Sequence, residues 1–182
     1  MNDTQLPRFE VFVQERRNGP HLNAGSVHAA DAELALLNAR DVFARRPECH
    51  GLWIVPADRV TARTAEQLAV EMPSSEPGES GRAETYRVFG KIGHKGTHEH
   101  LGRVEAASAG QAIRKAFDTF GSLSVTSWWV VPESACLESA EDEADAWFKP
   151  AQDKPFRDQA FYPVETFMRS LRRARESKEP RR

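Results

Sequence analysis

Two stretches of the chain show the same order of apolar and polar positions. In the first, residues 9–14 alternate as a half-buried strand does, and residues 24–29 follow a turn as the return strand. Apolar residues at helical spacing then predict a helix that Asp31 caps and that ends near Arg46. Residues 52–55 are apolar throughout and predict a third strand. The predicted order is therefore strand, strand, helix, strand.

The same pattern occurs a second time further along the chain. An offset of 77 residues relates Phe9 to Tyr86, and after one deletion an offset of 76 relates Trp53 to Trp129. Chance does not keep histidine, glycine, aromatic residues and proline in one register over this length, so we infer a tandem duplication. Further pairs in the register are His21 and His98, Gly25 and Gly102, Ala35 and Ala112, Phe43 and Phe120, and Pro56 and Pro132.

Particular residues support these elements. Gly25 and Gly102 lie inside the return strands, where a glycine is typical of a bulge or of a close approach to the backbone. In the second copy, Ser108 and Gln111 have the spacing of a capping box at the start of a helix. A short helix over about residues 65–71 is expected before a segment rich in proline, serine and glycine, which is typical of a linker.

The final strands of the two copies indicate how the copies pack. Residues 52–55 and 128–131 are apolar at every position, so both faces of each strand need cover. A helix of the same copy covers only one face, and the other must meet the sister copy, the C-terminal segment or another protein. We predict an α+β fold of two ββαβ repeats packed as an intramolecular pseudo-dimer. The predicted parts are a first repeat (1–62), a linker (63–84), a second repeat (85–137) and an acidic, aromatic and basic C-terminal segment (138–182).

Composition narrows the class of protein. The chain of 182 residues is 40% hydrophobic, and its 27 acidic and 25 basic residues give a formal charge of −2. This balance argues against a basic nucleic-acid-binding protein. No apolar run approaches the roughly 20 residues that span a bilayer, and residues 1–7 do not resemble a secretory signal. Cys49 and Cys136 lack the spacing of a metal site or disulfide framework. We therefore expect a soluble, cytoplasmic, globular protein without membrane or nucleic-acid partners.

The two predicted helices differ on their outer sides. Leu34 and Leu37 fall outside the apolar stripe of the first helix, whereas Gln111 and Arg114 occupy the equivalent positions of the second. The two leucines either lie under the C-terminal segment or contact a partner. The stripe that is expected to face the core of the first copy consists of Ala32, Ala35, Leu36, Ala39, Val42 and Phe43.

A search for catalytic or metal-binding motifs finds little. His94, His98 and His100 form the one histidine cluster, and an enzyme that binds metal through them is one hypothesis, although surface or turn histidines are the expected interpretation. The sequence contains no G-x-S-x-G, P-loop, G-x-G-x-x-G or H-E-x-x-H motif. We therefore predict no catalytic, metal-binding or cofactor-binding residues, and a binding or assembly role is favoured.

The C-terminal segment offers a different kind of interaction. After an acidic run over residues 138–145, Phe167, Leu171 and Ala174 recur at helical spacing among arginines. This pattern predicts an amphipathic basic helix. An alternative function is therefore a stand-alone α+β binding protein whose basic tail contacts nucleic acid or an anionic surface.

Several motifs are specific as a set. They are Phe9-Glu10-Val11-Phe12-Val13, Gly25-Ser26-Val27-His28-Ala29-Ala30-Asp31, Ala35-Leu36-Leu37-Asn38-Ala39-Arg40-Asp41, Arg45-Arg46, Trp53-Ile54-Val55, Lys154-Pro155-Phe156-Arg157 and Phe161-Tyr162-Pro163-Val164. Through these motifs the first copy closely resembles the PaaB family, the B subunits of the multicomponent phenylacetyl-CoA 1,2-epoxidase. The second copy resembles the family weakly, and the segment over residues 154–164 resembles it moderately.

The resemblance implies a role in an oxygenase complex. Members of that family are not catalytic and bridge pairs of ferritin-like A and C subunits, of which A holds the di-iron site. A reductase supplies the electrons from NADPH, so no cofactor is expected in this chain. This sequence departs from the family by carrying two copies. The second copy has lost several hallmarks: Glu105 stands for His28, Ser108 for Asp31, and Gly121-Ser122 for Arg45-Arg46.

We therefore predict a non-catalytic structural subunit of an epoxidase in aerobic phenylacetate degradation. Its expected partners are the catalytic A and C subunits and, indirectly, the reductase. The first helix and the C-terminal segment are expected to supply the contacts. The candidate interface residues are Leu34, Leu37, Arg45, Arg46, Phe156, Arg157, Phe161 and Tyr162.

Overall fold

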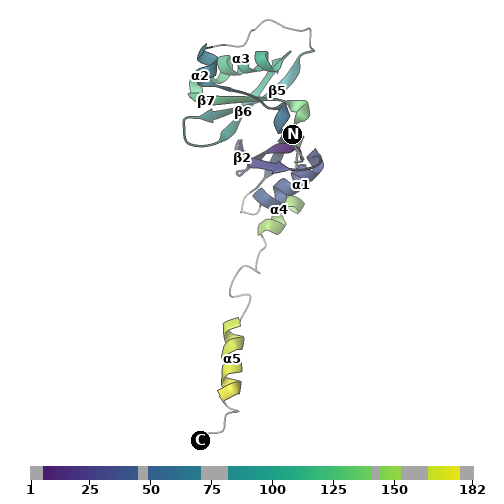
Figure 1. The fold of residues 1–182 in the computed structure, drawn as a ribbon, viewed down its shortest axis with the longest axis vertical. Coiled ribbons are helices and arrows are strands. Elements are labelled where there is room, and N and C mark those ends of the chain that lie inside the picture. Colours follow the sequence, from purple (N-terminus) through teal and green to yellow (C-terminus); the bar gives the residue numbers. More distant parts are fainter. Residues whose placement is uncertain (1–5, 45–48, 71–81, 141–143, 153–163, 177–182) are drawn as a thin grey trace, which may run out of the picture.

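The computed structural model describes residues 6–44, 49–70, 82–140, 144–152 and 164–176. It shows the two predicted repeats with matching elements in matching order (Figure 1). The first repeat contains β1 (Arg8–Gln14), β2 (His21–His28), α1 (Ala32–Phe43) and β3 (Gly51–Pro56). The second contains β5 (Glu84–Ile92), β6 (His98–Ala106), α3 (Ala109–Phe120) and β7 (Val125–Pro132). The α+β fold class is confirmed.

All strands belong to one eight-stranded sheet in the order β4-β7-β5-β6-β2-β1-β3-β8. In each repeat the first strand lies between the other two, and every pairing is antiparallel. The two halves join where β2 meets β6, with Leu22 opposite Glu99. The repeats therefore share a continuous backbone hydrogen-bond network.

Each repeat is followed by a short strand that pairs with the other repeat. β4 (Thr61–Thr64) follows β3 but pairs with β7 of the second repeat. β8 (Leu137–Glu138) follows β7 but pairs with β3 of the first repeat. Short 3-10 turns, η1 (Ala57–Arg59) and η3 (Glu133–Ala135), precede the two strands. The exchange is reciprocal, so each repeat is completed by the segment that follows its sister.

The helices after these strands continue the exchange. α2 (Ala65–Val70) follows β4 and buries Leu68 in the core of the second repeat. α4 (Ala144–Gln152) follows β8 and buries Phe148 in the core of the first repeat. Consequently α2 and α3 lie together at one end of the two repeats and α1 and α4 at the other, with the strands between (Figure 1). β4 and α2 occupy part of the stretch that was expected to be a linker, and α2 matches the short helix expected there.

The sheet has two apolar faces that lead to separate cores. Leu52 and Ile54 of β3 face the core under α1, whereas Trp53 and Val55 of the same strand face a core that both repeats share. In β7 the alternation is the same: Trp128 and Val130 face the core under α3, and the next residues face the shared core. The second face of each final strand therefore meets the sister repeat, which was one of the three covers that the sequence allowed.

The shared core has an internal pseudo-twofold symmetry. Phe12 and Phe89, which are equivalent residues of the two repeats, stack with ring centroids 4.1 Å apart. His21 stacks on Trp53 at 3.5 Å, and the equivalent His98 stacks on Trp129 at 3.8 Å. Rings stacked in this way contribute about 0.5–1.5 kcal/mol per pair beyond the area that they bury.

One buried charge breaks this symmetry. Arg87 on β5 is 1% exposed, and its guanidinium lies 3.9 Å from the centre of the Trp53 ring in the other repeat. It donates hydrogen bonds to Glu133 (2.9 Å) and to Glu138 on β8. The equivalent position in the first repeat is Glu10. Because a buried guanidinium needs partners, these bonds favour β8 lying across the first repeat.

The predicted irregularity in the return strands is confirmed. The register shifts opposite Gly25 and opposite Gly102, where the two glycines have φ of +133° and +155°. A Cβ at Gly102 would lie 2.8 Å from the Phe120 ring, and one at Gly25 would lie 3.3 Å from the equivalent Phe43. The positive φ therefore favours glycine at both positions, and the Phe120 ring leaves no space for a side chain at Gly102.

The helix starts are also as expected, with one difference in the buried stripe. Asp31 accepts a hydrogen bond from the Leu34 backbone N–H at 2.8 Å, and Ser108 accepts one from Gln111 at 3.3 Å. Val42, however, is exposed rather than part of the stripe. The sheet contacts the line of Ala35, Ala39 and Phe43, and Val42 lies at the edge of that line, on the solvent side. No helix in the described part of the chain is long and apolar enough to cross a membrane.

Three core histidines are held neutral by burial. Desolvation lowers the pKa of His21 to about 3 and the pKa values of His98 and His100 to about 4, because their charged forms lose hydration. The positive charge of Arg87 lowers the pKa values of His21 and His100 further. These rings therefore act as aromatic packing groups at neutral pH.

Removal of either ring of the central stack should destabilise both repeats together. We expect Phe12→Ala or Phe89→Ala to lower the free energy of unfolding by about 3–5 kcal/mol, as core aromatic truncations do. Urea unfolding followed by tryptophan fluorescence measures this loss, with the exposed Phe167→Ala as the control. Two separate unfolding transitions in the wild type would contradict a shared core.

Stability should depend on pH through the core histidines. The pKa of each is lower in the folded chain than its ordinary unfolded value of about 6.5, so the unfolded chain takes up protons first as the pH falls. The free energy of unfolding should therefore have its full value above about pH 6.5, and it should decrease as the pH falls from about 6.5 to about 4.

The variant His100→Asn, which introduces the residue of the equivalent position Asn23, should flatten this decline. The exposed His50→Asn is the matched control and should keep the wild-type slope. Urea unfolding at a series of pH values tests both variants. An unchanged slope in His100→Asn would show that His100 does not contribute.

Candidate partner-binding surface

The outer side of α1 exposes three apolar side chains. Leu34 is 41% exposed, Leu37 is 43% exposed and Val42 is 57% exposed. The helix packs on the sheet through Ala35, Leu36 and Ala39, which fixes the leucines on the opposite side. We call Leu34, Leu37, Asn38, Asp41 and Val42 the α1 face.

The equivalent residues of α3 are all polar or charged. They are Gln111, Arg114, Lys115, Asp118 and Thr119, and we call them the α3 face. Arg114 lies 3.7 Å from Asp118, and Lys115 donates to the Glu105 backbone oxygen at 2.6 Å. Gln111 accepts from the Ala107 N–H at 2.7 Å, so this face makes contacts within its own repeat.

The C-terminal segment covers the flank of α1 but leaves the two leucines exposed. The Arg40 guanidinium lies 5.4 Å from the ring centre of Trp147 on α4, and Phe148 enters the core beside α1. Arg40 also lies 3.3 Å from Asp41. Of the two sequence-based alternatives for Leu34 and Leu37, cover by the tail is therefore not provided by the described part of that segment.

The last helix, α5 (Val164–Glu176), carries a second exposed apolar stripe. Val164, Phe167, Met168 and Leu171 are each about half exposed or more. The predicted amphipathic helix is thus present. The other candidate residues, Arg45, Arg46, Phe156, Arg157, Phe161 and Tyr162, lie outside the described residues.

The histidine cluster is separated by its packing. His98 and His100 share the inner face of β6, as their spacing predicts, but His98 stacks on Trp129 while His100 lies 5.0 Å from Trp53. His94 is exposed in the turn before β6. Within the described ranges, no three histidine, cysteine, aspartate or glutamate residues are grouped so that they could hold a metal ion.

The cysteines do not form a nucleophilic site. Burial raises the pKa of Cys49 to about 11 and that of Cys136 to about 12, so both thiols stay protonated at neutral pH. Cys136 lies 3.5 Å from a nitrogen of Arg87, which orients it within the buried charge cluster.

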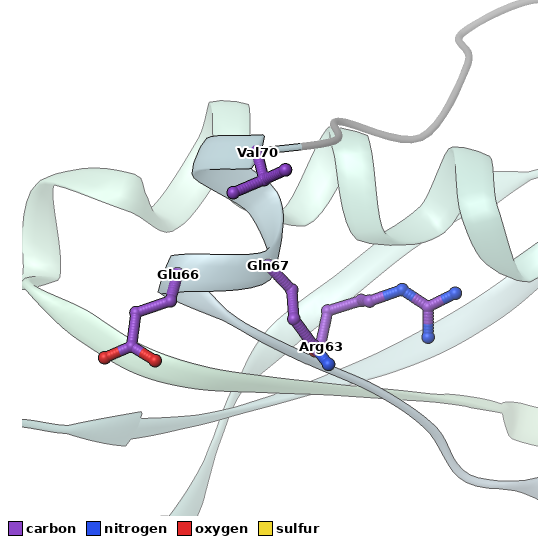
Figure 2. A pocket seen from close by; sticks show the side chains of 4 residues that line it. All are labelled: Arg63, Glu66, Gln67 and Val70. Carbon is purple, nitrogen blue, oxygen red and sulfur yellow. The ribbon is translucent and has the colours of Figure 1, made fainter.

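An open hollow of ≈ 520 Å³ lies beside α2 (Figure 2). Arg63, Glu66, Gln67 and Val70 line it, and Val70 is 90% exposed. The side chains of Glu66 and Arg63 point in different directions rather than toward a common centre (Figure 2). Catalysis and tight ligand binding both require convergent polar groups, and this hollow does not offer them.

The α1 face and the stripe on α5 are thus two helical surfaces of the described chain with several exposed apolar side chains. The sequence identified Leu34 and Leu37 because they fall outside the helical stripe. It missed Val42, because a strict helical period placed this residue with the core.

Comparisons with known proteins show the family of the chain. The family described as "Phenylacetic acid degradation B" (PaaB) matches residues 5–77 and residues 82–168. The B subunit of the 1,2-phenylacetyl-CoA epoxidase of Escherichia coli (strain K12) is 40% identical over 67 residues, which are 37% of this chain and 70% of that protein. No solved structure matches significantly. Since the family matches one segment for each repeat, and the two segments together span most of the chain, the chain belongs to the PaaB family.

Proposed function

We propose that this chain is a non-catalytic structural subunit of a multicomponent di-iron phenylacetyl-CoA epoxidase, in which it holds the ferritin-like catalytic A and C subunits together. Membership of the PaaB family and the similarity to the B subunit of an epoxidase support the proposal. The observation that carries it is the exposed apolar α1 face on a repeat whose interior is fully packed. Such a face is typical of a surface that another protein covers.

The α1 face is large enough to matter for binding. Covering a leucine that is about two-fifths exposed contributes roughly 1 kcal/mol, by the usual scale for burial of apolar side chains. Leu34, Leu37 and Val42 together would then contribute about 3 kcal/mol, or roughly a hundredfold in the dissociation constant. A helix of the catalytic subunits that carries an apolar stripe fits this surface.

The remaining candidate residues extend the proposed interface. The sequence places Arg45 and Arg46 directly after α1, and Phe156, Arg157, Phe161 and Tyr162 between α4 and α5. In the proposed complex the arginines pair with carboxylates of the catalytic subunits and the aromatic residues fill apolar hollows. This part of the proposal rests on the family resemblance.

A second candidate function follows from α5. Its exposed apolar stripe lies on a helix that also carries Arg169 and Arg173, a combination typical of helices that lie on anionic surfaces. The chain would then be a stand-alone binding protein that uses this helix on a membrane or nucleic acid. Binding to anionic vesicles or to RNA that is lost from a chain ending at residue 163 would support this function over the first.

Polar residues on the α1 face should abolish the proposed complex. In Leu34→Gln/Leu37→Arg each leucine receives the residue of the equivalent position on α3, so the substitutions suit an exposed helix. We expect the amount of catalytic A and C subunits that co-purify with the tagged chain to fall at least tenfold, because the apolar contact is replaced by a charge.

The matched control is Gln111→Ala/Arg114→Ala on α3, which should retain wild-type co-purification. Thermal unfolding of both variants separates loss of binding from loss of fold. Full co-purification of Leu34→Gln/Leu37→Arg would remove the α1 face from the interface. Epoxidation of phenylacetyl-CoA by the isolated chain would contradict a non-catalytic role.

A further inference from the structure

We infer that the surface on which the two repeats meet is an association surface that acts without the covalent link between them. The first piece of the chain (residues 1–70) and the second piece (residues 82–182) stay together when the chain is cut between them. The same surface pairs the repeats of two copies when the link is too short to join them within one chain. The partner that fits this surface is therefore a second copy of this chain. The inference does not depend on the proposed function.

The segment that joins the repeats does not hold them together. β4 and α2, which precede it, lie on the second repeat, and β5, which follows it, belongs to that repeat as well. The crossings between the repeats are instead at η1 and η3, each of which leads into an exchanged strand. A cut between the two pieces therefore leaves both crossings and both exchanged strands intact.

Each piece contributes apolar side chains that the other piece helps to bury. The first piece supplies Phe12 and Trp53 to the shared core and Leu68 to the core under α3. The second piece supplies Phe89 to the shared core and Phe148 to the core under α1. None of these five side chains is more than 9% exposed. An interface that resembles a domain core divided in two is typical of chains that associate permanently.

Backbone hydrogen bonds fix how the pieces dock. Along β4, four residues of the first piece pair with β7 of the second, and along β8, two residues of the second piece pair with β3 of the first. Next to β8, the Ser139 N–H donates to the Leu52 backbone oxygen at 2.9 Å, and the Leu52 N–H donates to Ser139 Oγ at 3.0 Å. Strand pairing has a defined register, so the two pieces meet in one arrangement.

The buried charges oppose the pairing of two first repeats. Arg87 of the second repeat lies over Trp53 of the first, and Glu133 and Glu138 accept its hydrogen bonds. In a pair of first repeats, Glu10 would take the place of Arg87, and alanines would take the places of the two glutamates. The face of an indole ring is negative and attracts a cation, so a carboxylate does not replace this contact.

A pair of two second repeats would keep its arginines. Each Arg87 would retain its two glutamates and would meet Trp129 in place of Trp53. Such a pair leaves the first repeats without a partner, however, and every chain carries the two repeats in equal number. Pairing of unlike repeats is therefore the arrangement that covers all of them.

The length of the link decides whether the pair forms within one chain. Thr64 at the end of β4 lies level with Lys91 of β5, because both are opposite Ser127 of β7. β5 begins at Glu84, about 23 Å from that level at roughly 3.3 Å per residue. α2 recovers at most about 9 Å of this distance, since a helix rises about 1.5 Å per residue. The link from Val70 to Glu84 must therefore span at least about 14 Å.

Cleavage of the folded, full-length chain tests the association. A protease recognition sequence is inserted between Ser75 and Glu76, and the purified chain is then cut. We expect both pieces to elute from gel filtration as one particle with the mass of the uncut chain. The urea midpoint of the cut protein should rise with protein concentration, because unfolding then separates two chains. Elution of the pieces as separate species would overturn the inference.

The role of the buried arginine is tested in the cut protein. We expect Arg87→Met to raise the dissociation constant of the two pieces at least tenfold, because Trp53 loses the guanidinium and the glutamates lose their partner. The matched control is Arg103→Met, which removes an arginine that is 55% exposed and that also bonds Glu133. Equal effects of the two variants, or a particle of two first pieces in native mass spectrometry, would contradict the selectivity.

A shortened link tests pairing between two copies. Deletion of residues 72–82 leaves two residues between Val70 and Glu84, and these span at most about 11 Å. We expect light scattering to give the mass of two chains for this variant. The control, in which glycine and serine residues of the same number replace residues 72–82, should have the mass of one chain. A folded monomer of the deletion variant would show that the repeats do not pair between copies.

Discussion

The structure depends on apolar packing between the two repeats, which covers the face of the sheet that the helices leave open. β3 and β7 are apolar on both sides, and the helix of each repeat covers one side only. Stacking of Phe12 on Phe89 closes the other side by pressing the two repeats against each other. A repeat of this size is only marginally stable alone, because a small domain buries a small fraction of its surface. The shared core therefore ties the stability of each repeat to that of the other.

The exchanged strands and the buried arginine strengthen this unit. β4 and β8 bind each repeat to the segment that follows the other, so the repeats cannot separate without breaking backbone hydrogen bonds. Arg87 has its charge satisfied by Glu133 and Glu138 while it covers Trp53 of the other repeat. Fusion into one chain allows the two halves to differ at such positions, which a dimer of identical repeats does not.

The freedom of the two fused repeats to differ in sequence also explains why the outer sides of α1 and α3 differ. Core residues such as Trp53 and Trp129 remain equivalent because a change in either would disturb both repeats. The outer helices carry no such constraint, and α1 is apolar where α3 is charged. A rigid interior and an exterior that differs between the two repeats suit the scaffold role that is proposed above. The neutral histidines His21 and His100 pack against the Trp53 ring of the interior.

The sequence by itself determined the duplication, the order of elements in each repeat, the glycine bulges, the helix caps and the exposed Leu34 and Leu37. These features depend on residues that are close in the chain or repeat at a fixed offset. Only the tertiary structure decided that β4 and β8 are exchanged, that Arg87 meets Glu138, and that Val42 joins the α1 face. The first two depend on which distant segments meet across the shared core, and the third depends on the angle at which α1 lies on its own sheet. Periodicity along one segment carries no information about either.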